Sequence, residues 1–323
     1  MSSWSRLFQQ FERNLRQNLS NMTSSLSARS PTPARPERAA PGDAEELKHA
    51  PGFQDLAKES NKQICNVKAL EIKVSSSDTV KAVAGFLHTP QNYRREQAEG
   101  REKTAAILLS GAGGGVVGPS SIYLSIADKL ASLRKGIPVL RLDYRYPARN
   151  KYCVPDVLAA MNYLENGFAV SRFVLVGWSF GSAPVLTVGA QDDRVVGCAT
   201  VAGQTAETEG MQQVARRNIP TLLLHGTSDR TLSPSCSESL REKYRRATQG
   251  GHCELQLFDG DDHALSKNAL KAEERLCDFI MAQAGEEIGA AEQESVVQKP
   301  LLDDRQRRAQ MEKGGDLQGE SIE

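Results

Sequence analysis

The chain lacks the features that mark several classes of protein. Its 323 residues carry 40 basic and 40 acidic side chains, so the formal net charge is zero. Without an excess of positive charge, the composition gives no support for nucleic acid as a partner. The apolar runs are far shorter than a membrane span. The start of the chain has no central apolar block, so we do not expect a secretory signal peptide.

Cysteine is scarce and scattered. The six cysteines form no C-x-x-C pair, which excludes a patterned disulfide framework and a cysteine zinc motif. No cluster of histidine and carboxylate has the spacing of metal ligands, and we expect neither a metal nor another cofactor. Reduced thiols are typical of intracellular proteins. We therefore expect an intracellular protein, with the cytoplasm favoured and a mitochondrial location left open.

The two ends of the sequence differ from its centre. Within an N-terminal extension over residues 1–60, residues 4–22 predict a helix with apolar side chains on one face and arginines on the other. Three roles stay open for this helix: a contact with mitochondrial import machinery, a contact with a membrane surface, or packing on its own protein. Residues 23–42 are rich in serine, proline and alanine, and residues 285–323 are polar without a core-forming period. We expect both stretches to be disordered.

Between the ends, residues 61–284 predict one domain in which strands and helices alternate. The first two strands indicate an antiparallel pair, and the later, continuously apolar strands indicate a parallel sheet covered on both faces. Only one short helix fits between Gly203 and Pro220, so no lid domain is expected. Predicted strands cover 67–74, 80–88, 105–109, 137–142, 173–176, 195–201, 221–225 and 255–258, and predicted helices cover 120–133, 154–164, 211–216, 235–246 and 264–282.

The segment Val174–Gly181 reads VLVGWSFG and is the most informative stretch of the chain. It places G-x-S-x-G directly after an apolar strand and before a segment compatible with a helix, which is the context that a nucleophile elbow requires. The glycines leave room for a sharp turn that exposes the hydroxyl of Ser179. The following helix directs N–H groups and its positive dipole end toward the reacting centre. The pattern predicts a nucleophilic serine.

An acid and a histidine each follow a strand of their own further along the chain. Asp229 comes shortly after the strand 221–225, and His263 comes after the strand 255–258. A serine needs a base to become nucleophilic, and an acid orients that base. The order of serine, aspartate and histidine is that of α/β folds with a nucleophile elbow. The weaker alternatives are His49, His88, His225 and His252 for the base, and Asp259, Asp261 and Asp262 for the acid.

Three motifs carry a resemblance to a known family. GWSFGS, HGTSDR and GDDHALSKN resemble the elbow, acid turn and histidine loop of α/β-hydrolases, and more narrowly of the small, capless dienelactone-hydrolase-like branch. The resemblance covers roughly residues 64–283. It implies an α/β fold with a mostly parallel, doubly wound sheet, an antiparallel N-terminal pair and no large lid. Ser179 stands where dienelactone hydrolase itself has cysteine. The resemblance therefore implies general serine-hydrolase chemistry but does not predict a lactone substrate.

The glycine-rich loop Ser110–Gly115 follows the strand 105–109 and offers an oxyanion hole. Two N–H groups are needed there. One is expected from Phe180, and the other from Ala112 or, as second choice, Gly113. A different interpretation also exists, because Gly113–Gly118 satisfies G-x-G-x-x-G after a strand, as in dinucleotide-binding proteins. A proline directly after this motif argues against that alternative, which also leaves the other three motifs unexplained.

The sequence as a whole predicts a cofactor-independent serine hydrolase. Ser179, His263 and Asp229 would cleave a small-molecule acyl ester or thioester through an acyl-enzyme. Acyl transfer and peptidase activity stay open. A second class, an α/β-hydrolase fold used only for binding, is disfavoured because all three triad positions hold competent residue types. The sequence indicates no oligomeric state.

Overall fold

The structure of the chain is a computed structural model that describes residues 43–60, 64–76, 79–94, 102–145, 148–318, 320 and 322. These residues belong to one compact unit. The predicted amphipathic helix at 4–22 and the linker at 23–42 lie outside them.

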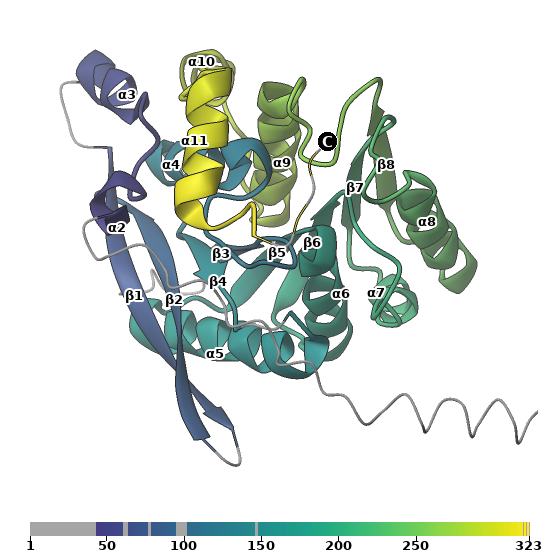
Figure 1. The fold of residues 1–323 in the computed structure, drawn as a ribbon. Coiled ribbons are helices and arrows are strands. Elements are labelled where there is room, and N and C mark those ends of the chain that lie inside the picture. Colours follow the sequence, from purple (N-terminus) through teal and green to yellow (C-terminus); the bar gives the residue numbers. More distant parts are fainter. Residues whose placement is uncertain are drawn as a thin grey trace, which may run out of the picture. The chain divides into compact units, whose positions relative to one another are not determined.

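A single eight-stranded sheet forms the centre of the molecule (Figure 1). Its strand order is β1-β2-β4-β3-β5-β6-β7-β8. β1 and β2 form the predicted antiparallel pair, β2 also runs antiparallel to β4, and all other neighbours are parallel. The predicted α/β class is therefore confirmed. The strands are β1 Cys65–Ser76, β2 Thr79–Pro90, β3 Thr104–Leu109, β4 Val139–Asp143, β5 Arg172–Trp178, β6 Val195–Val201, β7 Thr221–Gly226 and β8 Cys253–Phe258.

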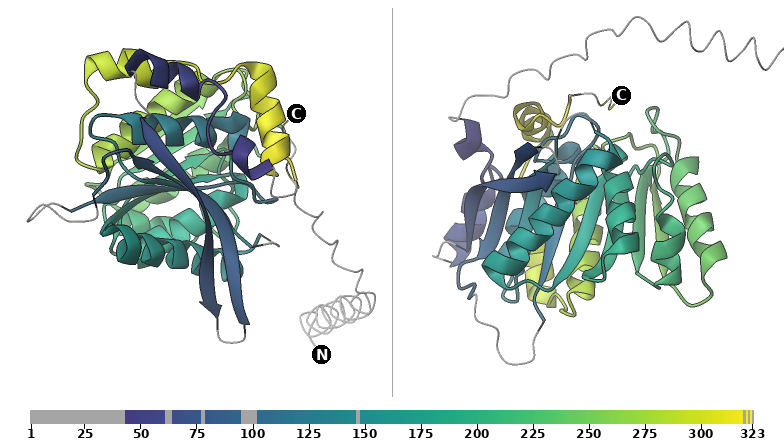
Figure 2. Two further views of the ribbon diagram at one scale, coloured as in Figure 1. Left: turned by 90° about the vertical axis from the view of Figure 1, so that its left-hand side faces the viewer. Right: turned by 90° about the horizontal axis from the view of Figure 1, so that it is seen from below.

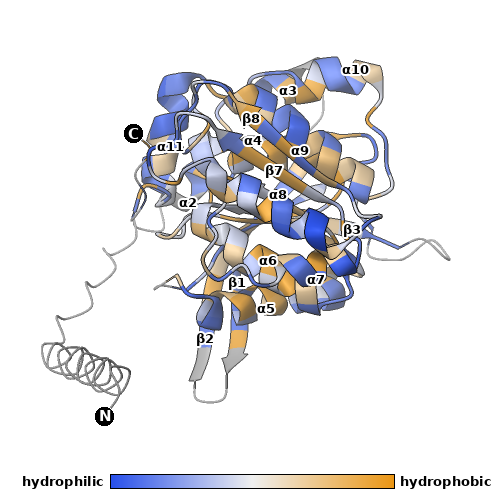
Figure 3. Cartoon of the chain, turned by 90° about the vertical axis from the view of Figure 1, so that its right-hand side faces the viewer, coloured by the Kyte–Doolittle hydropathy of each residue, from blue (hydrophilic) through white to orange (hydrophobic). Residues whose placement is uncertain are grey.

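The central parallel strands are mostly apolar because helices cover both of their faces. In β3 every residue is buried. Successive side chains of a strand point to opposite faces, and accordingly Ile107 and Leu109 join the core on one side of the sheet, whereas Ala106 and Leu108 join the core on the other. Hydrophilic residues gather on the outer side of α8 (Ser235–Ala247), away from the apolar strands (Figure 3).

Helices form one layer on each face of the sheet. One layer consists of α5 (Asn150–Phe168), α6 (Ser182–Gln191), α7 (Met211–Arg216) and α8. The other contains α4 (Ile122–Ser132) and α9 (Ala269–Gln283). As predicted, α7 is the single helix between β6 and β7, and no lid domain is inserted there.

The helix α9 begins at Ala269, later than the predicted start near residue 264. The reason lies in the two aspartates before it. Asp261 accepts hydrogen bonds from the N–H groups of Lys267 and Asn268, and Asp262 accepts from those of Ala264 and Ser266. These side chains compete with helical hydrogen bonding and hold a loop instead. His263 is therefore presented from a loop rather than from the first turn of a helix.

The prediction that residues 285–323 are disordered is wrong for the part that the structure describes. That part contains α10 (Ala290–Glu292), the turn η4 (Gln293–Val297) and α11 (Asp304–Gly314). Asp303 begins α11 with a capping box, and Gly315 ends it in the left-handed region at φ 81°. The segment contributes few apolar side chains and these have no regular period, but four of them are buried in the core: Val297, Leu301, Leu302 and Met311.

Buried ion pairs fix this C-terminal region to the sheet domain. Glu273 on α9 accepts from Lys129 at 2.6 Å and from Arg307 at 2.7 Å. Arg307 also donates to the carbonyl of Ser120 at 2.8 Å, and Lys129 donates to that of Val297 at 2.7 Å. Charges buried in this way are tolerated because each is paired and hydrogen-bonded. α11 is therefore an integral part of the fold.

The predicted domain boundary at residue 61 is also wrong, because residues 43–60 belong to the domain. They form α2 (Asp43–Glu46) and α3 (Phe53–Ser60), which lie on the same side of the sheet as α11 (Figure 2). The N–H of Gly52 donates to the carbonyl of Leu301 at 2.8 Å, and a Cβ at this glycine would lie 2.6 Å from that oxygen. Both flanks of the predicted domain therefore pack against each other.

Candidate active site

The nucleophile elbow has the local structure that its motif predicts. β5 ends at Trp178, Ser179 begins the short turn η3 (Ser179–Gly181), and α6 follows. Ser179 has φ 51°, a left-handed conformation that costs a non-glycine residue about 1–3 kcal/mol. A Cβ at Gly181 would lie 2.6 Å from the carbonyl oxygens of Leu109 and Ser110, and one at Gly177 would overlap the carbonyl of Gly181. Glycine is therefore required on both sides of the serine.

Asp229 and His263 meet at the carboxyl end of the sheet beside this elbow. His263 Nδ1 lies 2.7 Å from Asp229 Oδ2, and both side chains are fully buried. The other oxygen, Oδ1, accepts from the N–H groups of Thr231 and Leu232 at 2.8 and 2.9 Å. Trp178 Nε1 donates to the carbonyl of His263 at 3.0 Å, so the elbow and the histidine loop hold each other in place.

His225, which the sequence offered only as a weaker alternative for the base, is part of the same network. Its Nε2 lies 3.0 Å from both Asp229 Oδ2 and the carbonyl of Leu232, and its Nδ1 lies 2.7 Å from Ser237 Oγ. Two acceptors around Nε2 assign the proton to that nitrogen. Burial alone would raise the pKa of Asp229. Hydrogen bonds from His225 and His263 outweigh the effect of burial and hold the pKa of Asp229 well below its usual range. Asp229 therefore stays ionised.

The other candidates that the sequence offered for the acid and the base are exposed or are bound to other groups. Asp261 and Asp262 bind the backbone of their own loop. Asp259 is exposed, and His252 has a side chain that is 73% exposed. His49 and His88 lie in a separate cluster around Asp128, described below.

Contacts of Tyr144 hold the loop after β3 beside the elbow. The hydroxyl of Tyr144, just after β4, donates to the carbonyls of Ser110 and Gly111. Its ring meets that of Phe180 edge-on, with centroids 5.7 Å apart. Phe180 directly follows Ser179, which places its N–H in the elbow turn. The N–H of Ala112 donates to a carboxylate oxygen that reaches into the site from Glu320. The first-choice residue for the second oxyanion donor therefore faces the site.

Glu320 is the site residue that sequence reasoning missed, because nothing in a polar C-terminal stretch signals a fixed position. Its side chain is 3% exposed. Oε2 lies 3.2 Å from Ser179 Oγ and 3.3 Å from His263 Nε2, and Oε1 accepts from Ala112 N. His263 Nε2 makes no hydrogen bond with Ser179 in this arrangement. One carboxylate thus contacts the predicted nucleophile, base and oxyanion donor together.

Two carboxylates, those of Asp229 and Glu320, act on the charge of His263. Burial disfavours the imidazolium, but the carboxylates of Asp229 and Glu320 outweigh burial and raise the pKa of His263 to about 9. With Glu320 in place, His263 is therefore protonated at neutral pH. A protonated imidazole cannot accept the proton of a serine.

The motif Gly113–Gly118 holds an internal carboxylate. Asp316 is fully buried and accepts from the N–H groups of Val116, Val117 and Gly118 at 3.1, 3.0 and 2.7 Å. Successive N–H groups of this kind form an anion-binding nest. A pyrophosphate would need the same donors, so the structure gives no support to the dinucleotide alternative. Gly113, the second-choice oxyanion donor, lies against the backbone of Gln318.

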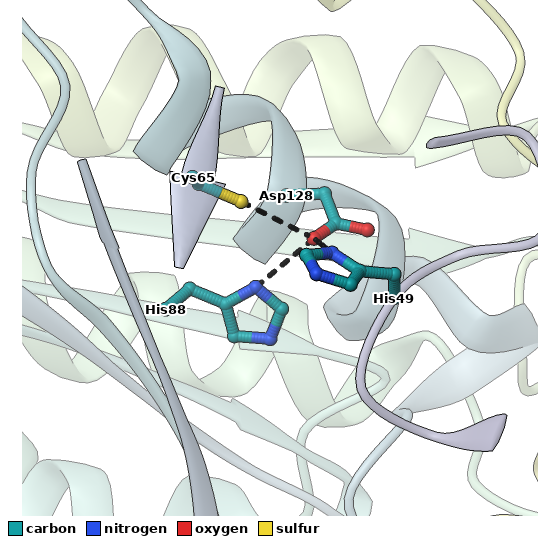
Figure 4. A group of neighbouring side chains, drawn as sticks. All are labelled: His49, Cys65, His88 and Asp128. Atoms are coloured by element: carbon teal, nitrogen blue, oxygen red, sulfur yellow. Dashed lines mark hydrogen bonds and ion pairs between the residues drawn. The ribbon is translucent and has the colours of Figure 1, made fainter. Parts of the chain in front are cut away.

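A second cluster has the residue types of a metal site (Figure 4). His49, Cys65, His88 and Asp128 bring four potential ligand atoms within 4.8 Å of one another. Their hydrogen bonds do not suit a cation. Arg141 Nε donates to His88 Nε2 at 3.0 Å, so the neutral His88 carries its proton on Nδ1 and donates it to Asp128 at 3.1 Å. Burial, then the Arg141 charge, lowers the pKa of His88 to about 4. We assign this cluster to a network that ties the N-terminal helices to the sheet.

Comparison with known proteins finds one family model and many solved structures that are similar to this chain. The model of the dienelactone hydrolase family matches residues 142–287, which include Ser179, Asp229 and His263. The chain has an α/β-hydrolase fold and resembles the dienelactone hydrolase family over these residues. Among curated proteins, no sequence matches it.

Solved structures similar to this chain share its fold at low sequence identity. Est1E from Butyrivibrio proteoclasticus has a TM-score of 0.52 at 15% identity, over 68% of this chain and 99% of its own. A putative dienelactone hydrolase from Klebsiella pneumoniae has a TM-score of 0.51 at 14% identity, over 67% and 98%. A puromycin-hydrolyzing peptidase from Mycobacterium tuberculosis has a TM-score of 0.54 at 17% identity, over 68% of this chain and 40% of its own.

None of the helices in the described part of the α/β-hydrolase is both long enough and apolar enough to cross a membrane.

Proposed function

We propose that this α/β-hydrolase is a serine hydrolase that cleaves a carboxylic ester or thioester through an acyl-enzyme. The observation that carries the proposal is the position of the Glu320 carboxylate. Oε1 accepts from the N–H of Ala112, while Oε2 lies within 3.3 Å of both Ser179 Oγ and His263 Nε2. A carboxylic acid released by a serine hydrolase has one oxygen in the oxyanion hole and the other at the nucleophile and base.

The proposed reaction begins when Ser179 Oγ attacks the substrate carbonyl and gives its proton to His263 Nε2. Asp229 holds Nδ1–H of the histidine and stabilises the imidazolium that forms. The N–H groups of Phe180 and Ala112 stabilise the oxyanion, where one such donor is worth about 10²–10³ in kcat. His263 then protonates the leaving alcohol or thiol. Water, deprotonated by the same histidine, attacks the acyl-enzyme and releases the acid and Ser179.

Esters are the first substrate class to examine. One similar structure, Est1E, has also been solved with ferulic acid bound, which is a carboxylic acid of the kind that ester hydrolysis releases. The similar puromycin-hydrolyzing peptidase keeps amide cleavage as the next class to test. The fold itself supports many chemistries and does not choose between them.

The test is hydrolysis of short-chain p-nitrophenyl esters, with the acyl-enzyme trapped by acid quench and located by mass spectrometry. We expect turnover and an acyl group on Ser179. Ser179→Ala should lose both, whereas Ser295→Ala, a change at an exposed serine, should retain both. An acyl group on any other residue, or equal turnover by Ser179→Ala, would contradict the proposal.

A further inference from the structure

The C-terminal residues after α11 reach the catalytic groups through two carboxylates that lie four positions apart in the sequence. Asp316 is bound in the nest at Val116–Gly118, and Glu320 is bound at Ser179, His263 and Ala112. Leu317 and Ile322, on either side of Gln318 and Glu320, are partly buried against the core. The described residues of this segment thus place one carboxylate, Glu320, at the glycine-rich loop Ser110–Gly115 and the other, Asp316, at the nest directly after it.

The glycines of that loop make room for the segment. A Cβ at Gly111 would overlap the carboxylate of Glu320, one at Gly113 would overlap the carbonyl of Gln318, and one at Gly115 would meet Asp316. An oxyanion hole by itself needs two N–H donors and does not need three such clearances. Because the clearance at Gly113 faces the backbone of Gln318 and the other two face carboxylates, the loop fits a peptide segment with acidic side chains as well as an oxyanion.

We propose that the site binds acidic peptide segments and that the segment carrying Asp316 and Glu320 is its built-in, product-like inhibitor. Glu320 occupies the place of the carboxylic product, with Asp316 as the anchor. The inhibitory role rests on the proposed function, whereas the binding of the segment does not. The segment has to leave the triad before a substrate carbonyl can reach Ser179.

With Glu320 in the site, the groups proposed for catalysis cannot act on a substrate. Glu320 fills the oxyanion position at Ala112 N and contacts both Ser179 Oγ and His263 Nε2. Its negative charge also favours the protonated form of His263, which cannot serve as a base. Both the space for the substrate carbonyl and the basic nitrogen are thus taken by one side chain.

Covalent attachment explains how a single carboxylate can hold this position. Gly315 ends α11, which is fixed by buried contacts, and Glu320 follows five residues later. A short tether of this kind gives an effective concentration in the millimolar range. A site with only millimolar affinity for a free acidic peptide would therefore still be occupied by its own chain, and could be vacated when a substrate or partner binds better.

The first experiment compares the rate at which a fluorophosphonate labels the full-length parent, Glu320→Ala and the control Glu312→Ala. Glu312 is an exposed glutamate on α11. A segment that closes the site nine-tenths of the time lowers the rate about ten-fold. We expect Glu320→Ala to react about ten-fold faster than the parent and Glu312→Ala to react like the parent. Equal rates for parent and Glu320→Ala would overturn the inhibitory role.

The second experiment supplies the segment in trans. A chain ending at Leu317, which keeps Asp316, should be labelled as fast as Glu320→Ala. A synthetic peptide DLQGESIE, the sequence of residues 316–323, should slow this labelling at millimolar concentration. The same peptide with alanine in place of its first glutamate should not. Equal inhibition by both peptides would show that the Glu320 carboxylate is not what the site recognises.

The third experiment separates failure of this inference from failure of the proposed function. NMR titration of the His263 imidazole needs no catalysis. If the segment occupies the site, the pKa of His263 is lower in Glu320→Ala than in the parent, even if neither protein reacts with the probe. An unchanged His263 titration would show that the segment does not reside in the site, whatever the labelling rates are.

Discussion

Arg307 offers a direct test of the finding that the C-terminal region belongs to the folded domain. Its guanidinium donates to Glu273 at 2.7 Å and to the carbonyl of Ser120 at 2.8 Å, and its side chain is 7% exposed. Removing one partner of a buried ion pair costs about 3–5 kcal/mol, because the other charge stays buried without compensation. Glu273 retains Lys129 at 2.6 Å and Ser125 at 2.7 Å. We therefore expect Arg307→Ala to lower the free energy of unfolding by about 3 kcal/mol, at the lower end of that range.

The assay is urea-induced unfolding of the full chain, followed by circular dichroism. The matched control is Arg308→Ala, which removes the exposed neighbouring arginine of the same helix. Surface substitutions of this kind usually change stability by about 0.5 kcal/mol or less. A loss below about 1 kcal/mol for Arg307→Ala, or equal losses for the two variants, would refute the packing of α11 on the sheet domain.

The remaining predictions concern the triad. Asp229→Asn should lower kcat about 10⁴-fold, because an amide cannot hold His263 in the right tautomer or stabilise its cation, whereas Asp259→Asn, at an exposed aspartate, should leave kcat unchanged. The groups that set the charge of His263 are Asp229, which is shared with His225, and Glu320. Burial opposes the charged form of His263, but these carboxylates raise its pKa to about 9. The ion pair between the His263 imidazolium and the carboxylates is therefore present below about pH 9 and is lost as the pH rises through that value. The rate of ester hydrolysis by the parent should therefore increase with pH up to about pH 9, and in Glu320→Ala the same increase should occur at lower pH. Coincident pH profiles of the two proteins would contradict an effect of Glu320 on His263.

Much of the fold follows from local patterns in the sequence. The short apolar runs of β3, β5, β6 and β7, each bounded by turn residues, fit a parallel sheet that is covered on both faces. The elbow is recognisable because backbone clearance around Ser179 requires glycine at positions 177 and 181. Asp229 and His263 could be predicted because each follows a strand whose carboxyl end lies at the same edge of the sheet. These features depend on neighbours in sequence and on sheet geometry.

The C-terminal region could not be predicted in the same way. Its place is set by long-range pairs such as Arg307 with Glu273 and Asp316 with the N–H groups at Val116–Gly118. A charged residue in a polar stretch has the same local signature whether it is solvated or buried against a distant partner. The same limitation applies to His225, whose contact with Asp229 follows from the geometry of the acid turn rather than from a motif.

Whether Ser179 is an activated nucleophile can be decided by locating a fluorophosphonate adduct by peptide mapping. The measurement is best made on Glu320→Ala, which leaves the triad uncovered, with the double variant Ser179→Ala/Glu320→Ala as control. If Ser179 is the nucleophile, we expect one adduct, on the Ser179 hydroxyl, and none in the double variant. A folded Glu320→Ala protein that stays unlabelled at Ser179 would contradict it and would favour a binding protein with an α/β-hydrolase fold.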